Sequence, residues 1–378
     1  MKIVVTGVSL FTCLGNTQET WRKILDGVSG IKTQQPFPFL PPLPLGMIDK
    51  QPTSIHHLTK TLIQQLCLDG KITPPQDNIG VIVGSSRGCQ SQWECFLSSP
   101  SPDFSSFSWL ETLPSQPALI IAQCLQTQGF VSAPANACAT GMVAIALGYE
   151  LIKQNRCSQV VVGGIENAIT PLTITGFNQM KAISKRGCFP FAVDRDGFAL
   201  GEGGGLLLLE TEASALARGA KIYGEILGWG MSCDAIAMTA PEASGNTAIN
   251  TIQTCLKNSH LTPHDIDYIH AHGTGTILND QREGQIIKHL FPHYPYISST
   301  KGFIGHTLGA SGAIASTLNF LALDKQILLP NTTNLTLDFN LNFVKQSHDY
   351  PLSNILCFSF GFGGQNVVIA MRKQTSQK

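Results

Sequence analysis

One cysteine in the sequence stands where its thiol could act as a nucleophile. Cys138 lies in the segment SAPANACATGMVAIALGYELIK, where small residues precede it and a helical pattern begins directly after it. The positive end of a helix dipole and its free backbone N–H groups favour the thiolate, which is the reactive form of cysteine. We therefore interpret Cys138 as a candidate nucleophile, against the plainer alternative of a buried structural cysteine.

Three glycine-rich segments further along the chain carry other side chains with reactive potential. Each has the form of a strand that ends in a tight turn, where the backbone can approach a ligand closely. Taken one at a time, each is equally compatible with an ordinary turn. The three segments are HAHGTGT at 270–276, with His272; STKGFIGH at 299–306, with Lys301 and His306; and SFGFGGQN at 359–366, with Phe360 and Phe362.

These segments must be positioned by strands and helices, and the sequence predicts an α/β fold. Short apolar, β-branched runs alternate with helical patterns, and near-continuous hydrophobicity in such runs is typical of strands covered on both faces. Helices are expected over 141–153 and 312–323. The predicted strands are 3–6, 80–84, 159–163, 206–210, 268–271, 296–299, 356–360 and 367–370.

A weak twofold organisation is visible along the chain. A strand, a small-residue segment and a helix follow one another around Cys138, and the region of His272 shows a comparable arrangement. We expect two halves, 1–228 and 229–378, that share one core. The Pro-rich stretch 34–52 and the Ser-rich stretch 98–108 are interpreted as surface loops or lids.

Composition excludes several classes of function. The chain has 378 residues, of which 43% are hydrophobic and only 13% charged, which hints that part of the surface is covered by a partner. Lys and Arg number 25, as do Asp and Glu, so no global field attracts nucleic acid or an anionic membrane. No apolar run approaches the roughly 18 residues of a membrane span. The first ten residues lack a secretory pattern, and we expect a cytosolic protein.

The cysteines and glycines give no sign of a metal or a cofactor. The 11 Cys are an odd number and show neither CxxC pairs nor Cys/His spacing, which argues against a disulfide framework and a zinc site. The Gly-rich turn at 201–204 lacks the context of a dinucleotide fingerprint. The sequence therefore predicts chemistry without metal or cofactor.

The order of the motifs, Cys at a helix start, then HGTGT, KGxxGH and GFGG, resembles the β-ketoacyl-acyl-carrier-protein synthases. These are decarboxylating condensing enzymes of the thiolase superfamily, and the likeness is to the elongating, Cys-His-His type. It spans nearly the whole chain, weakest over 31–78 and 89–112. It implies a thiolase-like fold of two pseudo-duplicated βαβαβαββ halves in α-β-α-β-α layers. Further similar segments are IVVTGVSLFTCLGN at 3–16, PFAVDRDGFALGEGGG at 190–205 and CDAIAMTAPE at 233–242.

The resemblance implies a reaction and roles for the site residues. Cys138 would accept the acyl group, and the neutral imidazoles of His272 and His306 would stabilise the enolate formed when malonyl-carrier loses CO2. Backbone N–H groups of Cys138 and Phe360 would form the oxyanion hole. Lys301 would fix the geometry and field around His306 and Cys138. Phe360 and Phe362 would gate the acyl pocket.

The resemblance also implies partners. An acyl carrier protein would deliver the acyl and malonyl groups, and Lys181, Lys185 and Arg186 would contact it. The chain would form a dimer, with a second copy or with a related ketosynthase subunit. The pathway implied is fatty acid or polyketide biosynthesis.

The sequence departs from the family pattern at three places. Many elongating synthases carry a Glu 14 residues after the motif lysine, where this chain has Ala315, so Lys301 lacks its usual partner. Arg87 stands where an apolar residue usually lines the acyl pocket near the dimer interface, unless it points to solvent instead. The stretch 184–191 is shortened near the entrance of the site.

Two other functions are compatible with parts of the pattern. A chain-length-factor-like subunit would complete a heterodimer without condensing anything, but such subunits typically lack the nucleophile that Cys138 supplies. A thiolase acting on coenzyme A thioesters needs a second catalytic Cys near the C-terminal Gly turn, and Cys357 precedes that turn on the strand. The condensing enzyme is therefore the preferred hypothesis.

Overall fold

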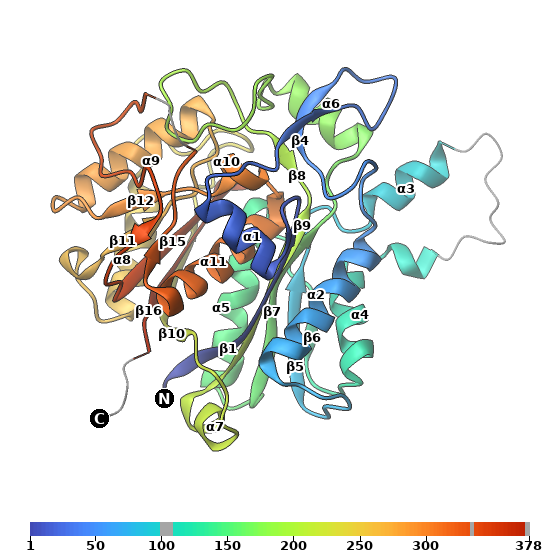
Figure 1. Ribbon diagram of the computed structural model, residues 1–378, viewed down its shortest axis with the longest axis vertical. Coiled ribbons are helices and arrows are strands. Elements are labelled where there is room, and N and C mark those ends of the chain that lie inside the picture. The colour runs from blue at the N-terminus through green and yellow to red at the C-terminus, as the bar shows by residue number, and fades with distance from the viewer. Residues whose placement is uncertain (99–108, 333–335, 375–378) are drawn as a thin grey trace.

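The computed structural model describes residues 1–98, 109–332 and 336–374. At its centre is a hydrogen-bonded sheet with the strand order β12-β11-β15-β16-β10-β1-β9-β7-β5-β6 (Figure 1). The strands of the first half are β1 (Ile3–Thr12), β5 (Ile79–Gly84), β6 (Val131–Ser132), β7 (Gln159–Glu166) and β9 (Gly203–Thr211); those of the second are β10 (Gly224–Cys233), β11 (Tyr268–His270), β12 (Tyr296–Ser298), β15 (Asn354–Gly361) and β16 (Gln365–Arg372).

The two halves of the sheet repeat one arrangement. The spatial order β6-β5-β7-β9-β1 of the first half corresponds to β12-β11-β15-β16-β10 in the second. In both halves the three outer strands are parallel and the remaining two join antiparallel. The halves meet where β1 pairs antiparallel with β10. Strands at the same place in chain order take the same place in space, so the predicted duplication is confirmed.

Helices form layers on and between the two half-sheets (Figure 1). Helices α2 (Ile55–Gly70) and α4 (Gln116–Leu125) pack on the outer face of the first half. Helices α8 (Asn246–Asn258) and α9 (Ile277–Leu290) pack on the outer face of the second. Between the half-sheets lie α5 (Thr140–Lys153) and α11 (Ser311–Lys325), whose side chains are almost all buried. The predicted layered fold and both predicted helices are confirmed.

The two central helices approach each other closely at their first turns. A Cβ on Gly141 would lie only 2.8 Å from both the Cβ and the backbone nitrogen of Ala313. Glycine is therefore required at this crossing, because any side chain would force the helices apart. The segments that lead into α5 and α11 carry Cys138 and His306, so this contact brings the two residues to one place.

The structure bears in different ways on the two expected loops and on the expected division of the chain. The stretch 34–52 is not all surface loop, because β4 (Leu43–Gly46) is buried and pairs with β3 (Lys32–Gln34) and β8 (Leu200–Gly201). Of the Ser-rich stretch, residues 99–108 lie outside the described residues. The division at residue 228 stays a prediction, and it falls inside β10, the strand that joins the halves.

The internal correspondence between the halves differs from the one expected. Cys138 follows β6 and precedes α5, and the equivalent position in the second half follows β12 and precedes α11. The counterpart of the Cys138 segment is therefore the His306 segment, while His272 follows β11, the counterpart of β5. The sequence pattern suggested His272 as the counterpart of Cys138. The reason is that the loops at these two residues are both short, rich in small residues and followed by a helix.

Candidate active site

Cys138 lies in a short 3-10 turn, η2 (Ala137–Ala139), directly before α5. The turn is sharp, because Ala137 has a φ of 48°, a conformation rare for a residue with a side chain. The Cys138 carbonyl accepts a hydrogen bond of 3.1 Å from the Ser359 hydroxyl on β15. Gly361 packs on the same turn, since a Cβ there would lie 3.1 Å from the Cys138 nitrogen. The nucleophile candidate is thus held by the end of β15.

The thiol of Cys138 is protonated at neutral pH. Burial raises the pKa of Cys138 to about 11, and the nearby Glu166 carboxylate also raises it. A hydrogen bond from the Phe362 backbone N–H and the charge of Lys301 act in the opposite direction. Backbone N–H groups at this turn do favour the thiolate, as expected, but the opposing effect of burial is larger.

The backbone N–H that faces the Cys138 sulfur belongs to Phe362. Phe362 lies in the turn η5 (Phe362–Gly364), after β15 has ended, whereas Phe360 still pairs with Asn366 in the β15–β16 ladder. The N–H assigned from sequence to Phe360 is therefore reassigned to Phe362. The choice could not be made from the letters SFGFGG, because it depends on where the strand stops.

His272 is buried at the end of β11. Its backbone N–H donates to Glu283 Oε1 at 2.6 Å, and its ring Nδ1 lies 3.4 Å from Lys301 Nζ. Burial, followed by the charges of Lys301 and His306, holds the pKa of His272 well below its ordinary value. The imidazole is therefore neutral at physiological pH.

His306 is buried beside His272, and the ring centroids lie 5.5 Å apart. Its Nδ1 is 2.8 Å from the Ser311 hydroxyl in the first turn of α11, and its ring stands edge-on to Phe198. Burial and then Lys301 hold the pKa of His306 well below its ordinary value. In each ring Nδ1 contacts the protein, which leaves Nε2 for a ligand.

Lys301 positions His272. Its ammonium donates to the His272 carbonyl as well as lying near Nδ1 of that ring. Its charge also acts on His306 and on Cys138, and the prediction that it fixes the geometry around these two residues stays a prediction. Burial lowers the pKa of Lys301, and the charge of Glu283 opposes that effect. Ala315 stands in the position of the usual Glu. The negative charge of Glu283 is the main effect that favours the protonated form of Lys301.

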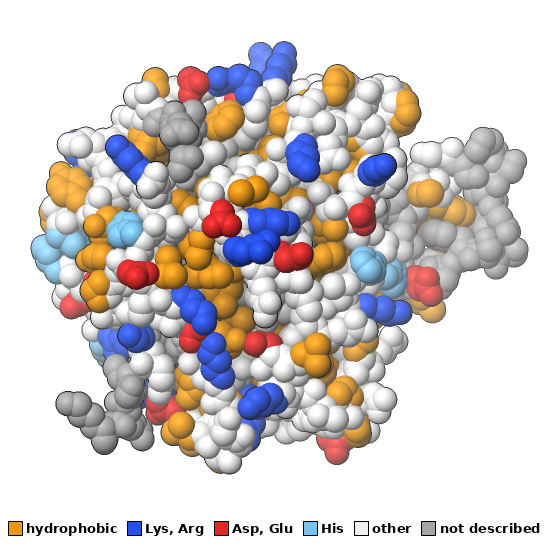
Figure 2. Space-filling model, viewed as in Figure 1, with side chains coloured by type: hydrophobic (Ala, Val, Ile, Leu, Met, Phe, Trp, Pro, Cys, Tyr) orange, Lys and Arg blue, Asp and Glu red, His pale blue; other side chains and the backbone are white. Residues whose placement is uncertain are grey.

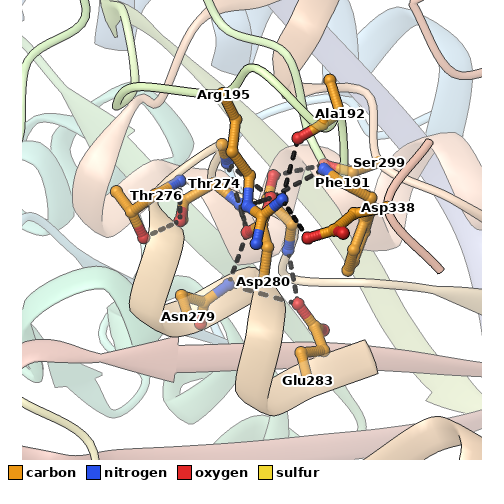
Figure 3. A network of polar contacts seen from close by, with 12 residues as sticks. Phe191, Ala192, Arg195, Thr274, Thr276, Asn279, Asp280, Glu283, Ser299 and Asp338 are labelled. Carbon is orange, nitrogen blue, oxygen red and sulfur yellow. Dashed lines mark hydrogen bonds and ion pairs between the residues drawn. The ribbon is translucent and has the colours of Figure 1, made fainter. Parts of the chain in front are cut away.

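Two buried carboxylates on α9 hold the HGTGT loop, and the sequence interpretation missed both (Figure 3). Glu283 accepts the N–H groups of His272 and Gly273 at 2.6 and 2.8 Å. Asp280 accepts the N–H of Thr274 at 3.0 Å, and it accepts the N–H of Gly275 at 3.1 Å through Oδ2 and 3.2 Å through Oδ1. The available signal was an acidic pair spaced by three, on the buried face of the helix that follows the loop.

A buried arginine ties these groups to the neighbouring segments (Figure 3). Arg195 Nη1 donates to the Ala192 carbonyl at 2.8 Å and to Asp338 Oδ2 at 2.7 Å. Its Nε lies 3.9 Å from Asp280 Oδ2, and Asp280 in turn accepts the Phe191 N–H at 2.7 Å. Segments 191–195 and 336–339 are thus anchored to α9, which supports the loop that carries His272.

Glu166, at the end of β7, is a third carboxylate that the sequence interpretation missed. It accepts N–H groups from Ser86, Arg87 and Gly309 at 2.8, 3.2 and 3.0 Å, and hydroxyl hydrogens from Ser85 and Ser86. This network joins the segment after β5 to the turn before α11. No sequence motif indicated the role of Glu166, because the groups that donate to it are mostly backbone N–H groups from distant parts of the chain.

A pocket of about 450 Å³ opens in front of Cys138. His272, His306, Phe360 and Phe362 line it with Cys138, so the structure brings together these five site residues predicted from sequence. Aromatic side chains dominate the inner wall, where Phe177 contacts both Phe198 and Phe362. A mostly apolar pocket with a few polar groups at its base is typical of a site for an organic substrate.

Arg87 and the expected carrier contacts lie outside this arrangement, with one exception. The Arg87 side chain is exposed and does not line the pocket in the single chain; only its backbone N–H reaches Glu166. Lys181 is exposed and does line the pocket mouth. Lys185 is exposed, and Arg186 pairs with Asp194 at 2.8 Å. The roles of all four residues stay predictions.

The shortened stretch 184–191 is a compact turn. Its Ser184 hydroxyl accepts the N–H groups of Arg186 and Gly187, and the buried Cys188 thiol contacts the Thr274 carbonyl.

Among the described residues, no group of three or more His, Cys, Asp or Glu could hold a metal ion, and no helix has the length and hydropathy to cross a bilayer. All 11 Cys are free thiols.

Comparison with known proteins adds an independent line of support. The family model described as Beta-ketoacyl synthase, N-terminal domain, matches residues 49–215, and the one described as Beta-ketoacyl synthase, C-terminal domain, matches residues 223–336. A similar curated protein is 3-oxoacyl-[acyl-carrier-protein] synthase 2 of Synechocystis, 34% identical over 98% of each chain. The protein of the same name from Staphylococcus aureus MRSA252 is 29% identical over 99% of this chain and 98% of its own.

Solved structures show the same likeness. A β-ketoacyl synthase from Burkholderia phymatum superposes with a TM-score of 0.90 at 26% identity, covering 99% of this chain and 100% of that one. A type II PKS ketosynthase in complex with its acyl-carrier protein has a TM-score of 0.91 at 27% identity, covering 99% of both. A ketosynthase from Xenorhabdus doucetiae, in complex with its chain length factor, has a TM-score of 0.88 at 26% identity over 99% and 98%.

Proposed function

This chain belongs to the β-ketoacyl synthase family, and we propose that it condenses an acyl group held on Cys138 with malonyl-acyl carrier protein, releasing CO2. The chain is an acyltransferase of the 3-oxoacyl-acyl-carrier-protein synthase class. The observation that carries the proposal is one pocket lined by a thiol and two neutral imidazoles, with a backbone N–H aimed at the sulfur.

The first step transfers the acyl group to the enzyme. The Cys138 sulfur attacks the carbonyl carbon of the acyl-carrier thioester, and its proton ends on the sulfur of the departing carrier. The backbone N–H groups of Cys138 and Phe362 would hold the oxyanion of the tetrahedral intermediate. Because the resting thiol is protonated, this proton must move as the new C–S bond forms.

The second step generates the carbon nucleophile. The bond between the malonyl carboxylate and Cα breaks, CO2 leaves, and the electron pair becomes an enolate on the malonyl thioester. Lys301 donates toward Nδ1 of His272, so Nε2 of that ring carries the hydrogen and can donate to the enolate oxygen. His306 donates through Nε2 in the same way if the Ser311 hydroxyl donates to its Nδ1. Each neutral ring still carries one N–H, and that N–H is the donor that this task needs.

The third step forms the product. The enolate carbon attacks the acyl carbonyl on Cys138, the C–S bond breaks, and β-ketoacyl-carrier leaves. The sulfur regains a proton, and the two N–H groups of the first step again hold the oxyanion. The two thioesters account for every atom but one: Cys138 leaves the product as a thiolate, and the proton that restores its thiol comes from the solvent at the open pocket.

Arg87 keeps a proposed role only in an assembly. Its exposed side chain could line an acyl pocket if a second chain covered this surface, as the resemblance implies. The acyl range would then be limited to short, unsaturated or polar groups. The cytosolic location also stays a prediction. Its support is that the curated relatives are 3-oxoacyl-[acyl-carrier-protein] synthases.

A decarboxylation assay separates the proposed roles. In Cys138→Ala, condensation should stop, while slow release of CO2 from malonyl-carrier should persist because both imidazoles remain. In His272→Ala, release of CO2 should also fall sharply, while acylation of Cys138 should continue. Condensation that continues in Cys138→Ala would overturn the proposal and favour the alternative of a chain-length-factor-like subunit assisting another enzyme in the assay.

A further inference from the structure

The segment 198–202, which contains β8, supports His306 from one side. The Phe198 ring stands edge-on to the His306 ring, with the centroids 5.1 Å apart. The His306 backbone N–H donates to the Ala199 carbonyl at 2.7 Å, and the His306 carbonyl accepts the Gly201 N–H at 3.1 Å. One face of the ring and both backbone polar groups of His306 therefore depend on this one segment.

The segment ends at Glu202, a buried carboxylate. On the face of the molecule shown in Figure 2, basic and acidic side chains are interspersed. Glu202 is completely buried instead, and within the described part of the chain it forms no ion pair. Its oxygens accept the N–H groups of Ile48 and Thr53 at 2.9 and 2.8 Å and the Thr53 hydroxyl at 3.0 Å. A buried carboxylate is costly unless such donors surround it, so Glu202 is tied to the loop 48–53.

Glu202 also lies where β4 and β8 meet, side by side in Figure 1. Its backbone N–H donates to the Gly46 carbonyl at 3.1 Å, next to the parallel pair of Gly46 and Gly201. Both strands press on the backbone before His306, because a Cβ on Gly46 or Gly201 would lie only 2.3 or 2.4 Å from the Ile304 carbonyl oxygen. A shift of either strand must therefore move the backbone that leads to His306.

We propose that Glu202 is a positioning residue for His306. The carboxylate holds the loop 48–53 and β4 against β8, and β8 holds the backbone and the ring of His306. This inference rests on the proposed function, in which Nε2 of His306 donates to the enolate oxygen. A misplacement of about 1 Å can cost about 10²-fold in rate. Cys138 is held by β15 instead, so loosening Glu202 should slow the release of CO2 and spare the acylation step.

The substitution Glu202→Gln tests this role. Glutamine keeps the volume of the side chain but replaces one acceptor oxygen with an NH2 group that faces a donor. Burial raises the pKa of Glu202 to about 7, so the rates are measured at pH 8, where most of the carboxylate is ionised. We expect release of CO2 from malonyl-carrier to fall at least tenfold. Acylation of Cys138 by hexanoyl-acyl carrier protein, followed by intact mass spectrometry, should stay within twofold.

The matched control is Glu210→Gln. Glu210 is also completely buried, but it lies near the far end of β9, where it accepts from Thr6, Ser214 and Arg218. This variant should unfold at a lower urea concentration and keep both rates in the folded enzyme. Equal losses of both rates in Glu202→Gln would reduce Glu202 to a structural residue and overturn the proposal, as would an unchanged release of CO2.

A double-mutant cycle tests whether the effect passes through His306. In His306→Ala, the residual release of CO2 that His272 supports should not fall further when Glu202→Gln is added. The same loss in both backgrounds would show that Glu202 acts elsewhere and would overturn the proposal.

Thr53→Val provides the test if Glu202→Gln does not fold. It removes only the hydroxyl that donates to Glu202, and we expect a loss of about threefold in CO2 release alone. No loss, or equal losses in both rates, would overturn the proposal. If the unaltered protein neither accepts the acyl group nor releases CO2, the proposed function itself fails.

Discussion

At the scale of single residues, the site works because burial sets the protonation states. All the central groups, Cys138, His272, His306 and Lys301, are buried, and in each the neutral form is favoured by desolvation. The enolate stabilisation that we propose uses the single N–H that a neutral imidazole carries. A neutral thiol is not what nucleophilic attack needs, so the cost of ionising Cys138 must be met within the reaction.

This predicts how Cys138 responds to pH. Because its pKa is raised to about 11, each unit of pH between 7 and 10 should raise the thiolate fraction and the alkylation rate by about tenfold. The rate of iodoacetamide addition to Cys138, followed by peptide mass spectrometry, checks this. Cys138→Ala controls for the other thiols. A rate that levels off by about pH 10 would show an ordinary or depressed pKa and would contradict this prediction.

Lys301 should matter through His272. In Lys301→Met the ring loses the donor that sets its tautomer, so we expect condensation to fall by about 10²- to 10³-fold. Alkylation of Cys138 should also slow, since the nearby positive charge lowers its pKa. Steady-state kinetics of Lys301→Met and of Lys288→Met, an exposed lysine on α9, make the comparison. Equal activity in the two variants would contradict this role.

At this scale the sequence was informative about reactive side chains and poor about their supports. Cys138, His272, His306 and Lys301 were identified by motif and meet in the structure. Glu166 was missed because its donors come from distant segments and leave no local pattern, whereas Asp280 and Glu283 were missed although they form an acidic pair spaced by three on the helix after the loop. The N–H at the Cys138 sulfur was assigned to Phe360 rather than Phe362 because the sequence does not show where β15 ends.

At the scale of elements, α9 is the platform of the site. Its first turns hold the HGTGT loop through Asp280 and Glu283, and Arg195 links that turn to two further segments. Loops rich in glycine lose much conformational entropy on ordering. Two carboxylates on one rigid helix offset that loss and fix where His272 points.

Removing Arg195 should therefore destabilise the fold. Arg195→Met leaves the buried Asp280 without its cation, and breaking a buried pair in this way costs about 3 kcal/mol of the free energy of unfolding. Urea unfolding, monitored by tryptophan fluorescence, provides the measurement. The exposed Arg22 supplies the control, since Arg22→Met should stay within about 0.5 kcal/mol of the unaltered protein. Equal unfolding midpoints would refute the anchoring role.

Among the elements, periodicity predicted the buried strands and both central helices. It did not predict β10, whose alternate residues are only half-buried, nor α2, whose sequence IHHLTKTLIQQLCLDG mixes polar and apolar residues. It misjudged β4 because the six prolines of stretch 34–52 suggested a loop. Glu202 accepts the N–H groups of Ile48 and Thr53 and holds that stretch against β8.

At the scale of the whole molecule, the duplicated halves place two helix starts side by side and so create one site from two distant segments. One edge of the large sheet is β6, a strand of two residues. Such a short edge strand offers little backbone for pairing with another chain. The expected dimer is supported instead by the low charged fraction of the chain.

The dimer is open to direct measurement. Light scattering at micromolar concentration should give twice the mass of one chain, because a large apolar interface keeps the two subunits together. A monomeric mass would contradict this expectation. Soluble dimer obtained only on co-expression with a related ketosynthase subunit would identify a heterodimer.

The central claim is that Cys138 carries the acyl group during condensation. Intact mass spectrometry, after incubation with hexanoyl-acyl carrier protein, should show one hexanoyl group added to the enzyme, and peptide mapping should place it on Cys138. Addition of malonyl-carrier should then remove that group and yield β-ketooctanoyl-carrier. Acylation that persists in Cys138→Ala, or an acylated Cys138 that malonyl-carrier does not discharge, would contradict the account.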